Sequence, residues 1–100
     1  YMEIKIENTG DRIVVSLIGR LDTITVGELE QQVLPLLKAG TDMLFDCNGL
    51  EYISSSGLRL ILLAHKKLSA SEGRLALSNV APSIKSIFDM TGFTSLLNFE

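Results

Sequence analysis

The order of the sequence patterns predicts an α/β domain in which helices cover a single mixed β-sheet of four to five strands. Two observations lead to this fold class. A hairpin-like pair of strand patterns opens the chain, and three helical patterns then alternate with shorter strand-like runs. Strands that are separated by helices tend to pair in parallel through right-handed crossovers. The expected order is therefore strand, strand, helix, strand, helix, strand, helix, strand.

The first twenty residues predict a β-hairpin. Ile4 and Ile6 alternate with charged residues, as in a strand with one buried face. Residues 8–11 (Asn-Thr-Gly-Asp) have the chemistry of a turn, and the run 13–18 that follows is rich in β-branched residues. This second strand is apolar on both faces, so we expect it to lie inside the sheet.

The first helix is expected from about Thr25 to Lys38. Thr25 and Glu28 have the spacing of a capping box, and apolar residues at helical spacing follow as far as Gly40. Pro35 lies inside this helix, where it removes a backbone donor and costs about 3 kcal/mol in a regular helix interior. We therefore expect a bend or an early break at Pro35.

The centre of the chain predicts a short strand, a loop and a long helix. Residues 43–47 form a short apolar strand pattern, and Asn48-Gly49 is expected to start the loop that leads to a run of serines. The second helix is expected from about Ser55 to Ala70, and Glu72-Gly73 ends it.

The last quarter of the chain predicts one further strand, a short helix and a terminal strand. Residues 75–78 have the pattern of a buried strand. Pro82 stands at a typical first helical position, and Gly92 follows the last helical residues. Residues 96–99 are expected to form the terminal strand.

Length, charge and cysteine content restrict the class of protein. One hundred residues are enough for one domain, 1–100, with a core of its own. The net charge of −3 and the absence of a basic cluster argue against nucleic acid and anionic membrane partners. The longest apolar run, 60–64, is far below the ~20 residues of a membrane helix. A single cysteine and no signal-peptide pattern predict a cytoplasmic protein, which we expect to be monomeric.

The run Ser54-Ser55-Ser56-Gly57 is the most informative local feature, because it lies where a strand region gives way to an apolar helix. The first N–H groups of a helix have no intrahelical partners, so an anion on one of these serines meets free donors and the positive end of the helix dipole. Gly57 is expected to leave room beside them. The simpler interpretation is an N-cap worth about 1 kcal/mol, for which one serine suffices. Three consecutive serine hydroxyls are more than a single N-cap requires.

The sequence gives little support for a catalytic site or a metal site. The one histidine, His65, lies about 15 Å along the helix from Ser55, too far to act as its general base. Position 53 is Ile, so the nucleophile-elbow pattern G-x-S-x-G is missing, and no glycine belongs to a P-loop. One Cys and one His cannot form a Cys/His metal site. We therefore expect no catalytic residue, no metal and no cofactor, and we interpret Cys47 and His65 as packing and solvent-edge residues.

Two carboxylates follow strand patterns. Asp22 ends the second predicted strand and Asp46 ends the third, so a mixed sheet could bring both near Ser55. In the simpler interpretation, Asp22 bounds the next helix and Asp46 fixes a turn.

Four motifs in the same order resemble the anti-sigma factor antagonists of bacteria, which are members of the STAS domain family shared with sulfate transporter tails. The motifs are Gly19-Arg20-Leu21-Asp22, the segment 44–50, Ile53-Ser54-Ser55-Ser56-Gly57-Leu58 and the segment 81–92. The resemblance runs nearly end to end and implies the STAS fold. Position 54 is Ser where the family motif usually has Asp, and the chain ends at Glu100 without the usual C-terminal helix.

The resemblance implies a function and a site. Ser55 corresponds to the family's phosphoacceptor and Asp22 to its acidic neighbour, with Ser54 as the cap, Ser56 and Gly57 as small neighbours and Asp46 also nearby. The unphosphorylated protein would sequester an anti-sigma factor that is also a serine kinase, and so release a sigma factor to activate transcription. A PP2C-type phosphatase would reset it.

The partner would contact the rim of the second helix, with Ser55 and Arg59, and the loop residues Asn48 and Glu51. Two other functions stay open. One is an accessory STAS subunit of an ABC-type lipid or anion transporter that is never phosphorylated. The other is a nucleotide-binding or hydrolysing enzyme, which the missing base and phosphate loop disfavour.

Overall fold

The computed structural model describes residues 1–100 and contains one five-stranded sheet with the order β1-β2-β3-β4-β5. The strands are β1 (Met2–Asn8), β2 (Ile13–Leu21), β3 (Asp42–Ile53), β4 (Arg74–Ser78) and β5 (Asn98–Phe99). The helices are α1 (Val26–Val33), α2 (Ser55–Ala70) and α3 (Pro82–Thr91), with 3-10 helices η1 (Leu34–Leu36) and η2 (Phe93–Ser95). Strands β1 and β2 pair antiparallel and all other neighbours pair in parallel. The predicted mixed sheet with three helices is confirmed.

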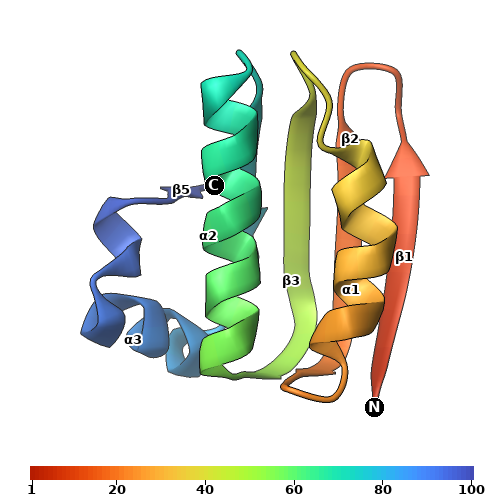
Figure 1. Ribbon diagram of the computed structural model, residues 1–100. Helices are drawn as coiled ribbons and strands as arrows, with labels where there is room; N and C mark the ends of the chain where they lie inside the picture. Colours follow the sequence, from red (N-terminus) through yellow and green to blue (C-terminus); the bar gives the residue numbers. More distant parts are fainter.

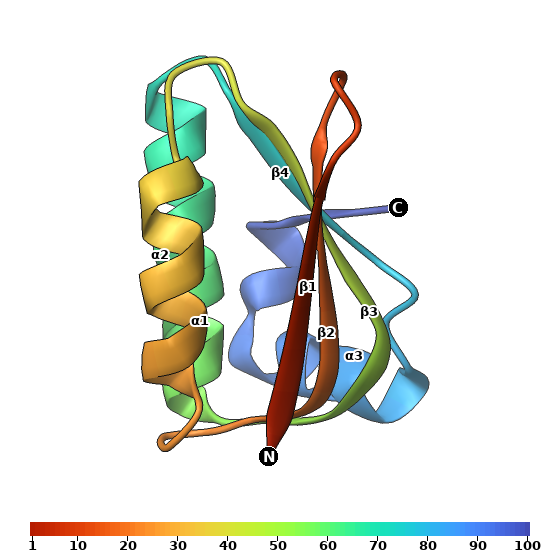
Figure 2. The ribbon, with the colours of Figure 1, turned by 90° about the vertical axis from the view of Figure 1, so that its right-hand side faces the viewer.

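Helices α1 and α2 lie side by side on one face of the sheet (Figures 1 and 2). They cover the row of β2 side chains formed by Val15, Leu17 and Leu21, which are fully buried. Helix α3 lies beside the lower end of α2, away from β1 (Figure 1). No helix has the length and apolar character that a membrane span requires.

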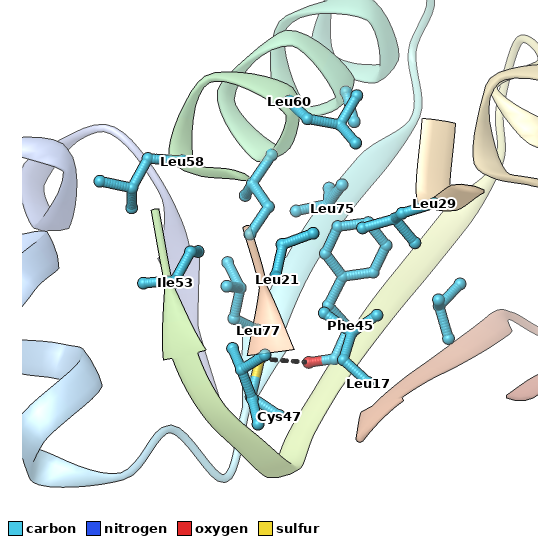
Figure 3. Packing of buried hydrophobic residues seen from close by; sticks show 14 of the residues in the cluster. Leu17, Leu21, Leu29, Phe45, Cys47, Ile53, Leu58, Leu60, Leu75 and Leu77 are labelled. Carbon is cyan, nitrogen blue, oxygen red and sulfur yellow. Dashed lines mark hydrogen bonds between the residues drawn. The ribbon is translucent and has the colours of Figure 1, made fainter. Parts of the chain in front are cut away.

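The apolar core lies between the sheet and the helices, with Ile84 and Phe88 of α3 buried in the same cluster as the residues under α1 and α2. Figure 3 shows Leu21, Ile53 and Leu58 at the end of this core where α2 begins. Cys47 also belongs to the core, and burial raises the pKa of its thiol to about 12. Such a thiol stays protonated and unreactive at neutral pH, which supports its interpretation as a packing residue.

Strand β3 is much longer than predicted. The expected loop at Asn48-Gly49 is wrong, because β3 continues to Ile53. The parallel register with β2 shifts between Ser16 and Ile18, where β3 carries an extra residue. Gly49 belongs to this irregular region, and a Cβ atom there would stand 2.9 Å from Ile18 Cγ1. The Asn-Gly pair therefore marks a bulge and a close strand contact instead of a turn.

The helix limits agree with the sequence except at the end of α1, which was expected at Lys38 and lies at Val33. Helix α2 has the predicted bounds, and Gly92 ends α3 with a φ of 80°. Helix α1 stops at Val33 and passes into η1 around Pro35, which confirms the expected early break. The predicted capping box is wrong. The Thr25 hydroxyl donates to Arg20 O at 2.7 Å and makes no bond to the first turn of α1.

Candidate functional site

The serine run follows the last residue of β3 and begins α2. Leu21 and Ile53 are register partners at the ends of β2 and β3, and Ser54 N donates to Leu21 O at 2.9 Å. The two chain segments that leave the sheet therefore begin side by side. This contact places the β2–α1 loop, with Asp22 as its first residue, next to the start of α2.

Ser54 is the N-cap of α2. Its backbone is extended, with φ −93° and ψ 172°, and its Oγ accepts from Gly57 N at 3.3 Å. Ser54 Oγ also lies 2.9 Å from Ser56 Oγ, and either hydroxyl can donate. The interpretation of Ser54 as the cap is confirmed, and the Ser56 hydroxyl is hydrogen-bonded to that of Ser54.

Ser55 is the remaining hydroxyl. It is the first residue of α2, its side chain is exposed, and its hydroxyl makes no hydrogen bond within the protein. The neighbouring N–H groups and the helix dipole favour a negative charge at this position. A phosphoryl group on Ser55 could therefore be accommodated without unfolding α2.

Gly57 has a different role from the one that the sequence predicted. It is buried, and a Cβ atom at this position would stand 2.8 Å from Leu21 Cγ and 3.0 Å from Ile53 Cγ1. The expectation that Gly57 leaves room beside the serines is wrong. Its missing side chain lets the first turn of α2 pack directly on the ends of β2 and β3.

Asp22 organises the neighbouring loop. Its Oδ1 accepts from Ile24 N and Thr25 N, each at 3.0 Å. The Thr25 N–H, with help from the Ile24 N–H, holds the pKa of the Asp22 carboxyl below its usual value. Arg20 Nε lies 3.7 Å from the second carboxylate oxygen, and its guanidinium lies over the Tyr52 ring at 4.2 Å. The structure thus places a negative charge in the loop that adjoins the serine run.

Asp46 is not part of this site. It lies in the middle of β3, seven residues before Ile53, which corresponds to about 23 Å of extended strand. Its Oδ1 accepts from Asn48 N at 3.0 Å and from Asn79 Nδ2 at 3.1 Å. The expectation that Asp46 lies near Ser55 is therefore wrong. The error follows from the misplaced end of β3.

The four residues expected to contact a partner do not form one patch. Arg59 is exposed and lies four residues after Ser55, so both belong to one face of α2. Glu51 is exposed two residues before the end of β3. Asn48 is also exposed, but it lies beside Asp46 farther along the strand. Both residues were expected in a loop, and the structure instead places them in β3.

Sequence reasoning missed an apolar surface beside the serine run. Ile24, two residues after Asp22, is 89% exposed, and Leu63 on α2 is 45% exposed. A shallow groove of about 190 Å³ runs between α1 and α2 and is lined by Val26, Glu30, Ser56, Arg59, Leu60 and Leu63. The sequence did contain a signal for this surface. Ile24 is an apolar residue in the Asp22–Thr25 turn, and it does not belong to the helical pattern that follows.

The cap predicts a measurable effect on stability. Replacing Ser54 with Ala removes the acceptor for the Gly57 N–H, so the free energy of unfolding should fall by about 1 kcal/mol. Ser54→Asp restores an acceptor and should recover most of this loss. Urea denaturation of the three proteins measures the difference. Equal stability of Ser54→Ala and the unsubstituted protein would show that the cap contributes nothing.

The fold defines the class of this protein as a small α/β domain whose mixed sheet carries α1 and α2 on one face. The sequence model described as STAS domain matches residues 3–100. The chain therefore belongs to the STAS domain family.

Known members of the family agree in sequence and structure. The anti-sigma-B factor antagonist of Staphylococcus epidermidis is 33% identical over 85 residues, which cover 84% of this chain and 79% of that protein. A crystal structure of an anti-sigma factor antagonist from Mycobacterium paratuberculosis has a TM-score of 0.88 at 21% identity and covers 99% of this chain and 85% of that one. The Bacillus cell fate determinant SpoIIAA in its phosphorylated form has a TM-score of 0.77 at 25% identity, over 98% of this chain and 91% of that one. The resemblance to anti-sigma factor antagonists is confirmed.

Proposed function

We propose that the protein is a cytoplasmic anti-sigma factor antagonist, a binding module without catalytic activity that is switched by phosphorylation of Ser55. The observation that carries this proposal is the exposed Ser55 hydroxyl, which has no partner in the protein and stands at the N-terminus of α2. The names of the relatives and the phosphorylated form of SpoIIAA support it.

In the unphosphorylated state, the surface around Ser55 suits a protein partner. Leu63 lines the α1–α2 groove, Ile24 exposes its apolar side chain in the turn before α1, and Arg59 and Glu30 supply charges at the groove. Central apolar anchors with polar groups around them are typical of protein interfaces. We propose that the anti-sigma factor docks here, with Ile24, Ser55 and Arg59 in contact. Glu51 extends this surface and Asn48 lies outside it.

Phosphorylation would change the charge of this surface more than its shape. A phosphoryl group brings a charge of about −1.5 to −2 to Ser55. Its location at a helix N-terminus favours survival of the fold. The Asp22 carboxylate in the adjoining loop adds a negative charge, so an acidic or apolar partner surface that touches Ser55 loses complementarity. Release of the anti-sigma factor then follows from local repulsion and desolvation.

The partners supply the chemistry. In this proposal the anti-sigma factor is a serine kinase that transfers phosphate from ATP to the Ser55 hydroxyl, and a PP2C-type phosphatase removes it. This chain supplies the acceptor and the docking surface and needs no cofactor. Bound to the unphosphorylated form, the anti-sigma factor cannot hold its sigma factor, and transcription is activated.

The site assignment is tested by labelling with the cognate kinase and radioactive ATP. Ser55→Ala should abolish labelling and leave binding of the kinase intact, because only one exposed hydroxyl is lost. Ser56→Ala is the matched control, since the Ser56 hydroxyl is bound to Ser54 and should not accept phosphate. Labelling that persists in Ser55→Ala contradicts the assignment. Labelling that disappears in Ser56→Ala, while this variant stays folded and still binds the kinase, also contradicts it.

A further inference from the structure

Strand β1 is the free edge of the sheet. It pairs only with β2, and no helix covers its outer side (Figure 2). Tyr1 O accepts from Arg20 N, and Thr9 N donates to Arg12 O, so the odd-numbered residues direct their backbone groups to β2. The N–H and C=O groups of Met2, Ile4 and Ile6 therefore point outward and are available to another strand.

This edge lacks several of the features that usually block strand addition. β1 runs for seven residues without Pro, Gly or a register shift against β2. Ile6 is 39% exposed, and Ile4 is only half-buried. The charged residues Glu3, Lys5 and Glu7 alternate with these apolar positions and lie on the opposite face of the strand. The signs of these three charges determine which strand can pair with the edge of β1.

We infer that this edge pairs with a second copy of the same chain, with the two β1 strands antiparallel and Ile4 opposite Ile4. In this register Glu3 of each copy faces Lys5 of the other, and Met2 faces Ile6. Opposite charges on directly facing residues stabilise antiparallel pairs. Met2, Ile4 and Ile6, whose backbone groups point outward, exchange the hydrogen bonds.

The alternative symmetric registers fit less well. Pairing centred on Lys5 places Lys5 opposite Lys5 and Glu3 opposite Glu7, and pairing centred on Glu3 places two glutamates together. Like charges in direct opposition destabilise a strand pair. Pairing centred on Ile6 places the apolar Ile4 opposite Asn8. In the register centred on Ile4, each of the apolar residues Met2, Ile4 and Ile6 faces an apolar residue, and the charged residues that face each other have opposite signs. No other register considered meets both conditions.

The dimer would keep both candidate sites accessible. The two-fold axis passes through the sheet at Ile4, so the helices of both copies cover the same face of one continuous sheet. The Met2 end of β1 lies beside Gly19, near the site, and antiparallel pairing therefore places the two serine runs at opposite ends. The proposed dimer differs from the monomer expected from the sequence, and it depends on neither phosphorylation nor the anti-sigma factor.

Sedimentation equilibrium of the purified full chain tests the pairing. The protein should form dimers that dissociate on dilution, and Lys5→Glu should weaken them at least about tenfold, because both facing pairs become like-charged. The double variant Glu3→Lys with Lys5→Glu exchanges the two signs and should restore dimers. Circular dichroism checks that each variant is folded.

Two charge reversals serve as controls. Lys67→Glu makes the same change on exposed helix α2 and should leave the dimer unchanged. Glu7→Lys should also have little effect, because Glu7 faces no charged side chain in the proposed register. A protein that stays monomeric up to about 1 mM overturns the proposal. Failure of the double variant to restore dimers, or dissociation by Glu7→Lys, also overturns it.

Discussion

A phosphoryl group on Ser55 should weaken binding of the anti-sigma factor by about a hundredfold, which corresponds to about 2.7 kcal/mol. Ser55 is exposed in the first turn of α2, and the loop beside it carries the Asp22 carboxylate, whose pKa is lowered by the N–H groups of its own loop. The added charge therefore joins the negative charge of the Asp22 carboxylate in the loop that adjoins the docking surface. Isothermal titration of protein that carries phosphoserine at position 55 measures the loss of affinity.

Phosphoserine at position 83 is a matched control for this titration. Ser83 is exposed in the first turn of α3, so it carries the same charge at the N-terminus of another helix. Binding should be unchanged by phosphate at Ser83, and circular dichroism should show both modified proteins folded. Equal affinity with and without phosphate on Ser55 would refute the electrostatic switch. An equal loss from phosphate on Ser83 would show a general effect of charge.

Gly57→Ala should destabilise the protein by about 1 kcal/mol net, because overpacking a tight core usually costs about 1 to 3 kcal/mol. The new Cβ would stand 2.8 Å from Leu21 Cγ and 3.0 Å from Ile53 Cγ1, which belong to the strand ends beneath α2. Alanine also favours a helix over glycine by about 0.5–1 kcal/mol, and this gain offsets part of the packing cost. Urea denaturation gives the free energy of unfolding.

Gly27→Ala is the control for helix propensity. Gly27 lies in the first turn of α1, and a Cβ at this position meets no atom within 4 Å. This substitution should stabilise the protein by up to about 1 kcal/mol. The two glycine variants are thus expected to change stability in opposite directions. A stabilising Gly57→Ala would show that α2 can move away from β2 and β3, and the packing role of Gly57 would be refuted.

Local signals predicted the helices well. The bounds of α2, the break at Pro35 and the ends of α3 at Pro82 and Gly92 agree with the structure. Each depends on caps, glycines or prolines within a few residues, and these act through the local backbone. The motif resemblance also located the correct segment for the candidate site, around Ser55.

Tertiary contacts explain the predictions that were wrong. The extra residues in β3 are held by its register with β2, and no local pattern reveals that register. The positions assigned to Asp46 and Asn48 depended on the misplaced strand end. Gly57 was misinterpreted because its close contact with Leu21 joins residues far apart in the chain. The Thr25 hydroxyl similarly finds its acceptor, Arg20 O, in the preceding strand end.

The switch at Ser55 is tested most directly by site-resolved mass spectrometry of the protein isolated from its native cell. We expect phosphate on Ser55 in a fraction of the molecules, and none on Ser54 or Ser56, whose hydroxyls are bound to each other. The fraction should change with the state of the kinase and the phosphatase. Phosphate confined to Ser54 or Ser56, or no phosphate at all while the kinase is active, would contradict the account.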